Sequence, residues 1–211
     1  MPAKNQDLHG NAPDKSAVAL LLIDVINDLA FEEGEQLLRF ALPMAERIAR
    51  LKRNAREAEV PVIYVNDNFG RWRSNVHALV EHCLNDDVRG RPLVERLRPE
   101  EEDYFVLKPK HSAFFSTTLD LLLEYLQVET VVLTGLAANI CVLFTANDAY
   151  MRDFRLVVPR DAVASNTEEE NLHALELMRT VLKADTRSSN DLDWAELKRT
   201  TECRRGPMTA P

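Results

Sequence analysis

The sequence predicts a single-domain α/β protein, a three-layer sandwich in which helices cover both faces of a mostly parallel central sheet of about six strands. Short apolar runs of strand length alternate along the chain with longer segments of helical periodicity. The apolar runs are continuous, as in AVALLLI at residues 17–23, which is typical of strands buried on both faces. A chain of 211 residues with 45% hydrophobic and 28% charged residues suits one domain with one large core.

The predicted domain begins with a strand and a long helix. Residues 1–16 are polar and are expected to form a flexible arm before the strand at 17–23. Residues 35–59 place apolar side chains at three- and four-residue spacing, with arginine and lysine between them, which predicts an amphipathic helix. Pro43 either kinks this helix or marks its start. Residues 60–65 (VPVIYV) form the second predicted strand.

A polar loop and a charged region separate the second strand from the third. The loop at 66–72 contains two aromatic side chains, and residues 74–102 are helical in places and strongly charged. The third strand covers 103–107, and a short helix at 117–127 leads to the fourth strand at 128–134.

The remaining elements alternate in the same way, so that the domain extends over residues 17–199. They are a helix at 140–154, a strand at 155–158, a helix at 168–183, a short strand at 184–186 and an aperiodic tail at 200–211 that we expect to be flexible.

Charge and cysteine content narrow the classes of function. The net charge of -8 argues against a nucleic-acid surface, because phosphate binding needs a basic face. Cys83, Cys141 and Cys203 are too widely spaced for a disulfide framework or a zinc site, which indicates a reducing, cytoplasmic setting. The polar N-terminal segment lacks the apolar core of a signal peptide. No apolar run approaches the roughly 20 residues that span a bilayer, so we expect no membrane partner.

Three chemically reactive side chains follow predicted strands. Asp24 comes directly after the first strand and Lys108 after the third. Cys141 lies in the first turn of the helix that is predicted after the fourth strand. Because the carboxyl ends of parallel strands meet at one edge of the sheet, we expect these side chains to lie together. Taken singly, each has an ordinary alternative: a turn or cap aspartate, a solvated surface lysine, and a small buried thiol.

Together the three side chains form a set suited to acyl transfer. A cysteine attacks an acyl carbon, and a nearby carboxylate takes the thiol proton and later delivers one to a leaving amine. Lys108 would stabilise the carboxylate and a thiolate. The position of Cys141 in the first turn of a predicted helix also favours a thiolate. No histidine belongs to this set; His111 is nearby in sequence, but the lysine after the strand suits the role better.

Three separated motifs carry a resemblance to a known family. Residues 22–29 (LIDVINDL) are similar to its LIDMQNDF motif, and residues 106–115 (VLKPKHSAFF) resemble its lysine motif K-x-x-x-S-A-F. Residues 134–142 (TGLAANICV) resemble its nucleophile corner. The chain therefore resembles the isochorismatase-like cysteine hydrolase superfamily over residues 17–189. This superfamily includes nicotinamidases, N-carbamoylsarcosine amidases, ureidoacrylate amidohydrolases and isochorismatases.

The resemblance implies a role for each matched residue. Cys141 would be the nucleophile, Asp24 the general base and acid, and Lys108 their charged partner. The backbone N–H groups of Ala137 and Cys141 would form the oxyanion hole, next to a cis peptide bond between Leu136 and Ala137. The predicted substrate pocket is lined by Asn27, Leu29, Trp72, Phe114 and Leu136.

Departures from the family pattern restrict the substrate. The nicotinamidases bind a metal through an aspartate and closely spaced histidines, whereas the loop at 66–72 has Asp67 but no histidine before His77. We therefore expect neither a metal nor another cofactor. Leu29 and Ile26 replace a phenylalanine and a glutamine of the first motif, which points to a substrate other than nicotinamide. A cysteine at position 141 favours the amide-cleaving branch, since the isochorismatases that act on a vinyl ether commonly carry another residue there.

The sequence thus predicts a cysteine-dependent hydrolase that cleaves a C–N bond of a small amide, carbamoyl or ureido substrate through a thioester. We also expect a homo-oligomer, either a dimer or a tetramer. Two alternatives remain open: vinyl-ether hydrolysis of the isochorismatase type with Asp24 as the acid, and a non-catalytic binding protein on the same fold.

Overall fold

The sheet is parallel and places the first strand near its centre. The computed structural model describes residues 15–68 and 75–202. The strand order is β3-β2-β1-β4-β5, and β6 pairs with the end of β4. All of these pairings are parallel. The strands are β1 (Val18–Ile23), β2 (Val62–Asp67), β3 (Tyr104–Lys108), β4 (Thr130–Leu136), β5 (Arg155–Val157) and β6 (Val163–Ala164).

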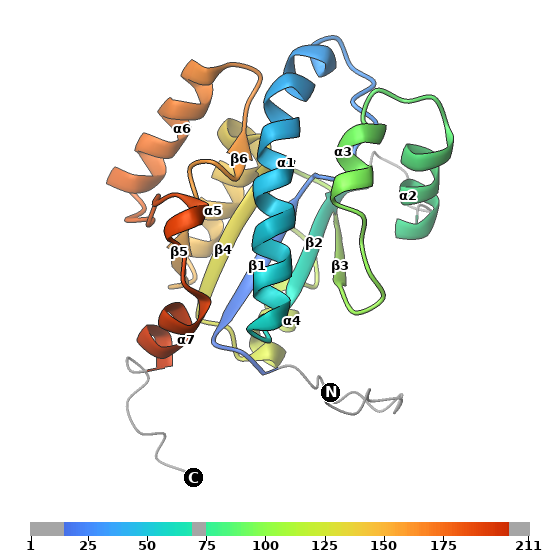
Figure 1. Ribbon diagram of the computed structural model, residues 1–211. Coiled ribbons are helices and arrows are strands. Elements are labelled where there is room, and N and C mark those ends of the chain that lie inside the picture. Colours follow the sequence, from blue (N-terminus) through green and yellow to red (C-terminus); the bar gives the residue numbers. More distant parts are fainter. Residues whose placement is uncertain (1–14, 69–74, 203–211) are drawn as a thin grey trace.

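Helices cover both faces of this sheet, which confirms the predicted three-layer α/β fold (Figure 1). One core lies between the sheet and α1 (Gly34–Glu57), α2 (Val76–Asn85), α3 (Arg91–Arg96) and α7 (Trp194–Glu202). The other lies beneath α4 (Leu119–Leu126), the π-helix η1 (Ala138–Val142), α5 (Leu143–Tyr150) and α6 (Glu168–Thr180). A short 3-10 helix, η2 (Ser189–Asp191), precedes α7.

The continuous apolar run of β1 is explained by the two cores. Leu20 and Leu22 pack on the α1 side, whereas Leu21 and Ile23 pack on the α5 side. Successive side chains of a strand point to opposite faces, so a strand covered on both sides needs apolar residues at every position. All six residues of β1 are buried.

Helix α1 forms where its apolar periodicity predicts. Its buried residues recur every three or four positions along the face that packs on the sheet. Pro43 lies inside the helix, so it does not mark the start. The helix ends before Glu59, whose positive φ of 54° redirects the chain toward β2.

Gly135 is required where β4 passes β1 near their carboxyl ends. Its φ is +110°, and a Cβ atom built on it would lie 2.1 Å from the carbonyl oxygen of Ile23. Any side chain at this position would therefore separate the two strands just before Asp24 and the cysteine-bearing turn.

Several predicted boundaries differ from the structure. The predicted strand at 184–186 is a single bridge between Val157 and Asp185, and the sixth strand is instead β6, which is only two residues long. The predicted helix at 140–154 divides into η1 and α5. The first residues of the predicted tail continue α7, where the hydroxyl groups of Thr130 and Thr201 lie 2.8 Å apart in the core. A tertiary contact thus holds a segment that has no periodicity of its own.

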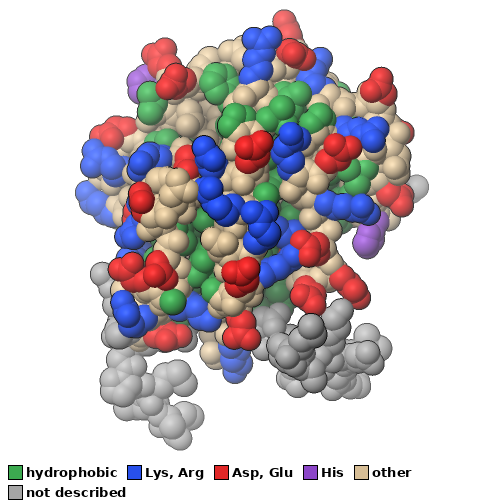
Figure 2. Space-filling model, viewed as in Figure 1, with side chains coloured by type: hydrophobic (Ala, Val, Ile, Leu, Met, Phe, Trp, Pro, Cys, Tyr) green, Lys and Arg blue, Asp and Glu red, His purple; other side chains and the backbone are tan. Residues whose placement is uncertain are grey.

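Among residues 15–68 and 75–202, no helix is long and apolar enough to cross a bilayer. On the face covered by α1, basic and acidic side chains are interspersed rather than gathered into a patch of one sign (Figure 2).

Candidate active site

Asp24 follows β1 in a strained backbone conformation. Its φ is +51°, a left-handed value that is uncommon for residues other than glycine. Its N–H donates to the carbonyl oxygen of Val65 at 2.9 Å. The loop beyond it is fixed by Asn66, whose side chain accepts from the N–H of Ile26 at 3.0 Å and donates to its carbonyl oxygen at 2.7 Å. Asn66 is thus a positioning residue that the motif comparison did not reveal.

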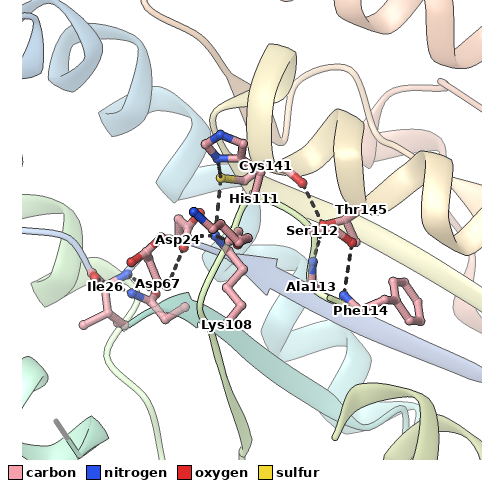
Figure 3. Close-up of polar contacts among 12 residues, drawn as sticks. Asp24, Ile26, Asp67, Lys108, His111, Ser112, Ala113, Phe114, Cys141 and Thr145 are labelled. Carbon is pink, nitrogen blue, oxygen red and sulfur yellow. Dashed lines mark hydrogen bonds and ion pairs between the residues drawn. The ribbon is translucent and has the colours of Figure 1, made fainter. Parts of the chain in front are cut away.

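Lys108, the last residue of β3, is a fully buried cation at the centre of the site (Figure 3). Its Nζ lies 2.9 Å from Asp24 Oδ2 and 3.3 Å from Cys141 Sγ. It also donates to the carbonyl oxygen of Lys110 at 3.1 Å. An ammonium has three hydrogens, and these three partners account for them. Lys108 therefore acts as a fixed donor, and its orientation is set by the strand end and the loop that follows.

Cys141 reaches the site from the π-helix η1. Such single-turn π segments are rare and occur often at functional sites. The side chains of Asp24, Lys108 and Cys141 come from the ends of three strands, β1, β3 and β4, and they converge as the parallel topology predicts.

The protonation states follow from burial and charge. Burial raises the pKa of Asp24, although the Lys108 ammonium and the thiol of Cys141 oppose this. Burial by itself lowers the pKa of Lys108, but the charges of Asp24 and Cys141 outweigh it, so the net shift is upward. Burial, and next the Asp24 carboxylate, raise the pKa of Cys141 to about 12, against the opposing effect of Lys108.

These shifts correct the expectation of a resting thiolate. Lys108 is the cation at the site, and it already faces the carboxylates of Asp24 at 2.9 Å and Asp67 at 3.7 Å. A third negative charge in a buried site is unfavourable, and the partial charge at a helix terminus does not compensate for it. These shifts favour a protonated thiol at Cys141, beside a carboxylate of increased basicity.

The backbone corner before Cys141 differs from the one that the resemblance implies. No peptide bond in the described residues is cis, so the predicted cis bond between Leu136 and Ala137 is wrong for this structure. Ala137 enters η1 with an ordinary extended backbone, φ −83° and ψ 144°, and the turn closes without a cis bond. The assignment of the Ala137 and Cys141 N–H groups to an oxyanion hole stays a prediction.

The predicted pocket residues occupy several environments. Asn27 Oδ1 accepts from the N–H of Leu29 at 2.8 Å and shapes the loop after Asp24. Leu29 and Leu136 are buried in the core on the α1 side. Phe114 turns into the opposite core, where its ring lies 5.9 Å from that of Phe154 and points away from Cys141 (Figure 3). Trp72 lies outside the described residues.

The S-A-F part of the lysine motif ties the loop after Lys108 to α5, the helix that directly follows the Cys141 turn. Ser112 Oγ donates to Asp148 Oδ2, and the N–H of Ala113 donates to Thr145 Oγ1 at 3.0 Å. Thr145 Oγ1 in turn donates to the carbonyl oxygen of Cys141 at 2.7 Å. The loop after Lys108 is thereby tied to the turn beyond Cys141, which gives this motif a positioning role.

A histidine also borders the thiol, a contact that the sequence did not predict. His111 Nδ1 lies 3.8 Å from Cys141 Sγ, and its ring packs at 5.3 Å against that of Phe144. The side chain of His111 is exposed, unlike that of Lys108. The signal in the sequence was its place three residues after Lys108, on the loop that has to return past the nucleophile.

Metal ligands do not gather in the described part of the chain. Among residues 15–68 and 75–202, no group of three or more His, Cys, Asp or Glu side chains is arranged to hold an ion. The backbone N–H of Asp67 donates to Asp24 Oδ1 at 2.7 Å, and its carboxylate lies 3.7 Å from Lys108 Nζ.

Known proteins share this fold and much of this sequence. The family profile described as "Isochorismatase domain" matches residues 18–189. Isochorismatase family protein YaaI of Bacillus subtilis, itself uncharacterised, is 44% identical over 171 residues, which cover 81% of this chain and 93% of YaaI. Ureidoacrylate amidohydrolase RutB of Methylorubrum extorquens is 31% identical over 187 residues, which cover 77% of this chain and 74% of RutB. Among solved structures, N-carbamoylsarcosine amidase of Thermoplasma acidophilum has a TM-score of 0.65 and 27% identity, over 83% of this chain and 98% of that chain.

The matched region includes every strand described above and the three converging side chains. Two of these relatives are named as enzymes that hydrolyse amide-type bonds. The chain therefore belongs to the isochorismatase family.

Proposed function

We propose that this protein is a cysteine-dependent amidohydrolase, which cleaves a C–N bond of a small amide, carbamoyl or ureido compound through a thioester on Cys141. The observation that carries the proposal is the contact of Lys108 Nζ with both Asp24 Oδ2, at 2.9 Å, and Cys141 Sγ, at 3.3 Å. The names of the RutB and N-carbamoylsarcosine amidase relatives support a ureido or carbamoyl substrate.

In the acylation step, Asp24 takes the proton of the thiol as Sγ attacks the substrate carbon. The raised pKa of Asp24 makes it a stronger base than an ordinary carboxylate, which suits the removal of a proton from a thiol. Lys108 keeps its proton and offsets the negative charge that passes between Sγ and the carboxylate. The N–H groups of Ala137 and Cys141 would bind the developing oxyanion.

Collapse of the tetrahedral intermediate completes the acylation. The C–N bond breaks, and the leaving nitrogen takes the proton that Asp24 had received. The thioester is then hydrolysed by water, which returns the thiol and releases the acid or carbamate. Each proton that leaves one group is received by another, so the cycle needs no cofactor.

The raised pKa of Asp24 also favours a second candidate, vinyl-ether hydrolysis with Asp24 as the acid. A carboxyl group that holds its proton at higher pH is a suitable proton donor. This reaction makes no covalent bond to Cys141, so the fate of that residue separates the two reactions. A binding protein on the same fold would show neither activity.

The deciding experiment begins with a screen of small amides and ureides, in which turnover is measured as the release of ammonia. On the best substrate, Cys141→Ala should lose nearly all turnover, and mass spectrometry of the quenched parent enzyme should detect an acyl adduct on Cys141. Cys141→Ser should be little better, because a hydroxyl group is far less ionised than a thiol. An active Cys141→Ala enzyme, with no adduct on the parent, would refute the amidohydrolase assignment.

We further propose that the protein acts in the reducing cytoplasm and that Asn27 contacts the substrate in its pocket.

We also propose that the protein is a homo-oligomer. Besides Phe144, which packs against His111, exposed large apolar side chains of the described residues concentrate on the face formed by α4, α5 and α6: Phe115, Leu121, Tyr125, Ile140, Tyr150, Met151, Leu172, Leu177 and Val181. At about 200 Å² for a large side chain, their exposed fractions amount to roughly 1,000 Å². This is similar to the roughly 800 Å² that each partner buries in a stable complex.

A second copy of the chain is the proposed occupant of this face. Light scattering at micromolar concentration should give the mass of a dimer or a tetramer. The double substitution Leu121→Glu and Met151→Glu, on exposed positions of this face, should give a monomer with an unchanged circular dichroism spectrum. A monomeric parent protein would contradict the proposal.

A further inference from the structure

We propose that His111 is a further catalytic residue, which serves as the base for the water that hydrolyses the thioester on Cys141. This inference rests on the proposed amidohydrolase function and assigns its second half-reaction to a side chain outside the Asp24, Lys108 and Cys141 set.

The thiol is bordered on two sides by groups of different character. Lys108 Nζ approaches Sγ at 3.3 Å from the buried side. His111 Nδ1 approaches it at 3.8 Å, and Figure 3 shows the imidazole ring on the side of the sulfur away from Lys108. His111 is exposed, so the side on which it lies is the one that water can reach. A water between Nδ1 and a carbon bonded to Sγ would be within hydrogen-bond reach of the imidazole.

The position of His111 relative to the sulfur is fixed by the fold. The preceding residue is held through its carbonyl oxygen by Lys108, and the two following residues are held by α5 through the Ser112–Asp148 and Ala113–Thr145 hydrogen bonds. Ring packing against Phe144 limits rotation of the imidazole. A base held by its neighbours in this way costs little reorganisation at the moment of reaction.

Asp24 is less well placed to activate this water. Its Oδ1 accepts from the N–H of Asp67 at 2.7 Å, and its Oδ2 is paired with Lys108 at 2.9 Å. Its side chain is only 9% exposed. The acyl group on Sγ would further separate it from solvent. Asp24 therefore accepts the proton of the thiol, while His111 faces the side from which water enters.

His111 does not form a thiolate–imidazolium pair with Cys141 in the resting enzyme. Such a pair lowers the pKa of a cysteine, whereas burial and Asp24 raise the pKa of Cys141 to about 12. Lys108 brings the Asp24 carboxylate and Cys141 together on the buried side of the sulfur, so Asp24 is the proposed acceptor of the thiol proton and His111, on the other side, is left for the later step.

The proposed step is balanced in atoms and protons. The water oxygen bonds to the thioester carbon while one water proton moves to His111 Nδ1. The C–S bond then breaks, and the thiolate of Cys141 takes the proton back from His111. The products are the free thiol, neutral imidazole and the acid or carbamate.

The test uses the full chain and the best substrate from the amide screen. His111→Gln removes the base and keeps a polar side chain, and His111→Phe keeps the packing against Phe144. His173→Gln, at an exposed position of α6, is the matched control. We expect kcat to fall about 100-fold in both His111 variants, within the range for loss of a general base. The control should keep the activity of the parent enzyme, and all variants should melt at the parental temperature because the side chain is exposed.

The amount of acyl adduct shows which half-reaction is slowed in the His111 variants. Mass spectrometry of samples quenched at steady state should find the Cys141 adduct in most His111→Gln molecules and in few parent molecules. Hydroxylamine, a nucleophile that needs no base, should attack the accumulated thioester, release a hydroxamate and restore turnover of the variant. Both results would support His111 as the deacylation base.

The two proposals fail in distinguishable ways. A parent enzyme that forms the adduct, together with His111 variants that keep the parental kcat or that slow without accumulating the adduct, would overturn the role of His111 alone. An active Cys141→Ala enzyme would overturn the thioester mechanism and this inference with it.

Discussion

Replacement of Lys108 by methionine tests the charge balance on which the proposed mechanism depends. Methionine is similar in length, but it removes a cation that is fully buried and paired with Asp24 at 2.9 Å. The remaining carboxylate would lie in a site that is nearly closed to water. Breaking a buried ion pair in this way costs about 3–5 kcal/mol, because an uncompensated charge is left behind.

The penalty should depend on pH in a direction that follows from the pKa of Asp24. Burial already raises this pKa in the parent protein, and loss of the Lys108 ammonium removes a group that opposes the rise. A carboxyl group with a raised pKa in the folded state contributes stability that is present at acid pH and is lost as the pH rises through that pKa. Relative to the parent, Lys108→Met should therefore be least destabilised at acid pH and increasingly destabilised as the pH rises through the raised pKa of Asp24.

Urea unfolding at several pH values measures this effect, and Asp24→Asn provides the control. In the double variant no charge is left at either position, so its loss of free energy of unfolding should be smaller than the sum of the two single losses by at least about 1 kcal/mol. Turnover should be abolished in all three variants. If Lys108→Met were as stable as the parent at neutral pH, or if the two losses were additive, the pairing of Lys108 with Asp24 would not be the interaction inferred here.

Four further predictions follow from the site. Because Asp24 has to be ionised to accept the thiol proton, kcat/KM should fall as the pH drops through its raised pKa. The midpoint of this acid limb should lie above the ordinary carboxyl value of about 4; a midpoint at or below that value would contradict the role of Asp24. Iodoacetamide should label Cys141 slowly at neutral pH and about tenfold faster per pH unit up to pH 9, since the thiolate is the reactive form. Cys83 should stay unlabelled because it is fully buried, and a Cys141 rate that is independent of pH near neutrality would indicate a resting thiolate. Asn66→Ala should lower the free energy of unfolding by about 2 kcal/mol or more, because it leaves two buried backbone groups of Ile26 unpaired. It should also reduce kcat, and a variant with parental stability and activity would remove the positioning role. Activity should survive prolonged incubation with a chelator; recovery only after the addition of zinc, manganese or iron would reveal a metal site.

The convergence of Asp24, Lys108 and Cys141 could be predicted from local features of the sequence. Continuous apolar runs identify strands that are buried on both faces, and parallel strands bring their carboxyl ends to one edge. Asp24, Lys108 and Cys141 follow such runs, so their proximity depends on topology alone and not on fine packing. The same reasoning gave the three-layer architecture and the long helix α1, whose periodicity is strong over many residues.

Features that depend on contacts between distant segments were decided only by the tertiary structure. The pKa of Cys141 reflects burial and the charge of a residue from another strand, so the helix position alone predicted the wrong direction. His111 meets the thiol because two hydrogen bonds to α5 fold its loop back across the sheet edge. Phe114 turns into the core together with its neighbour Ala113, whose N–H is held by Thr145 of α5.

Short elements likewise could not be predicted from the sequence. Strand β6 has two residues, too few to show a period, and it forms because Gly135 and Leu136 offer it a parallel partner. Sequence patterns thus determined which residues meet at the sheet edge, because repeating hydrophobicity sets the elements and parallel topology orders them. The three-dimensional packing determined their protonation, their orientation and their additional partner, because burial and charge act through space and not along the chain.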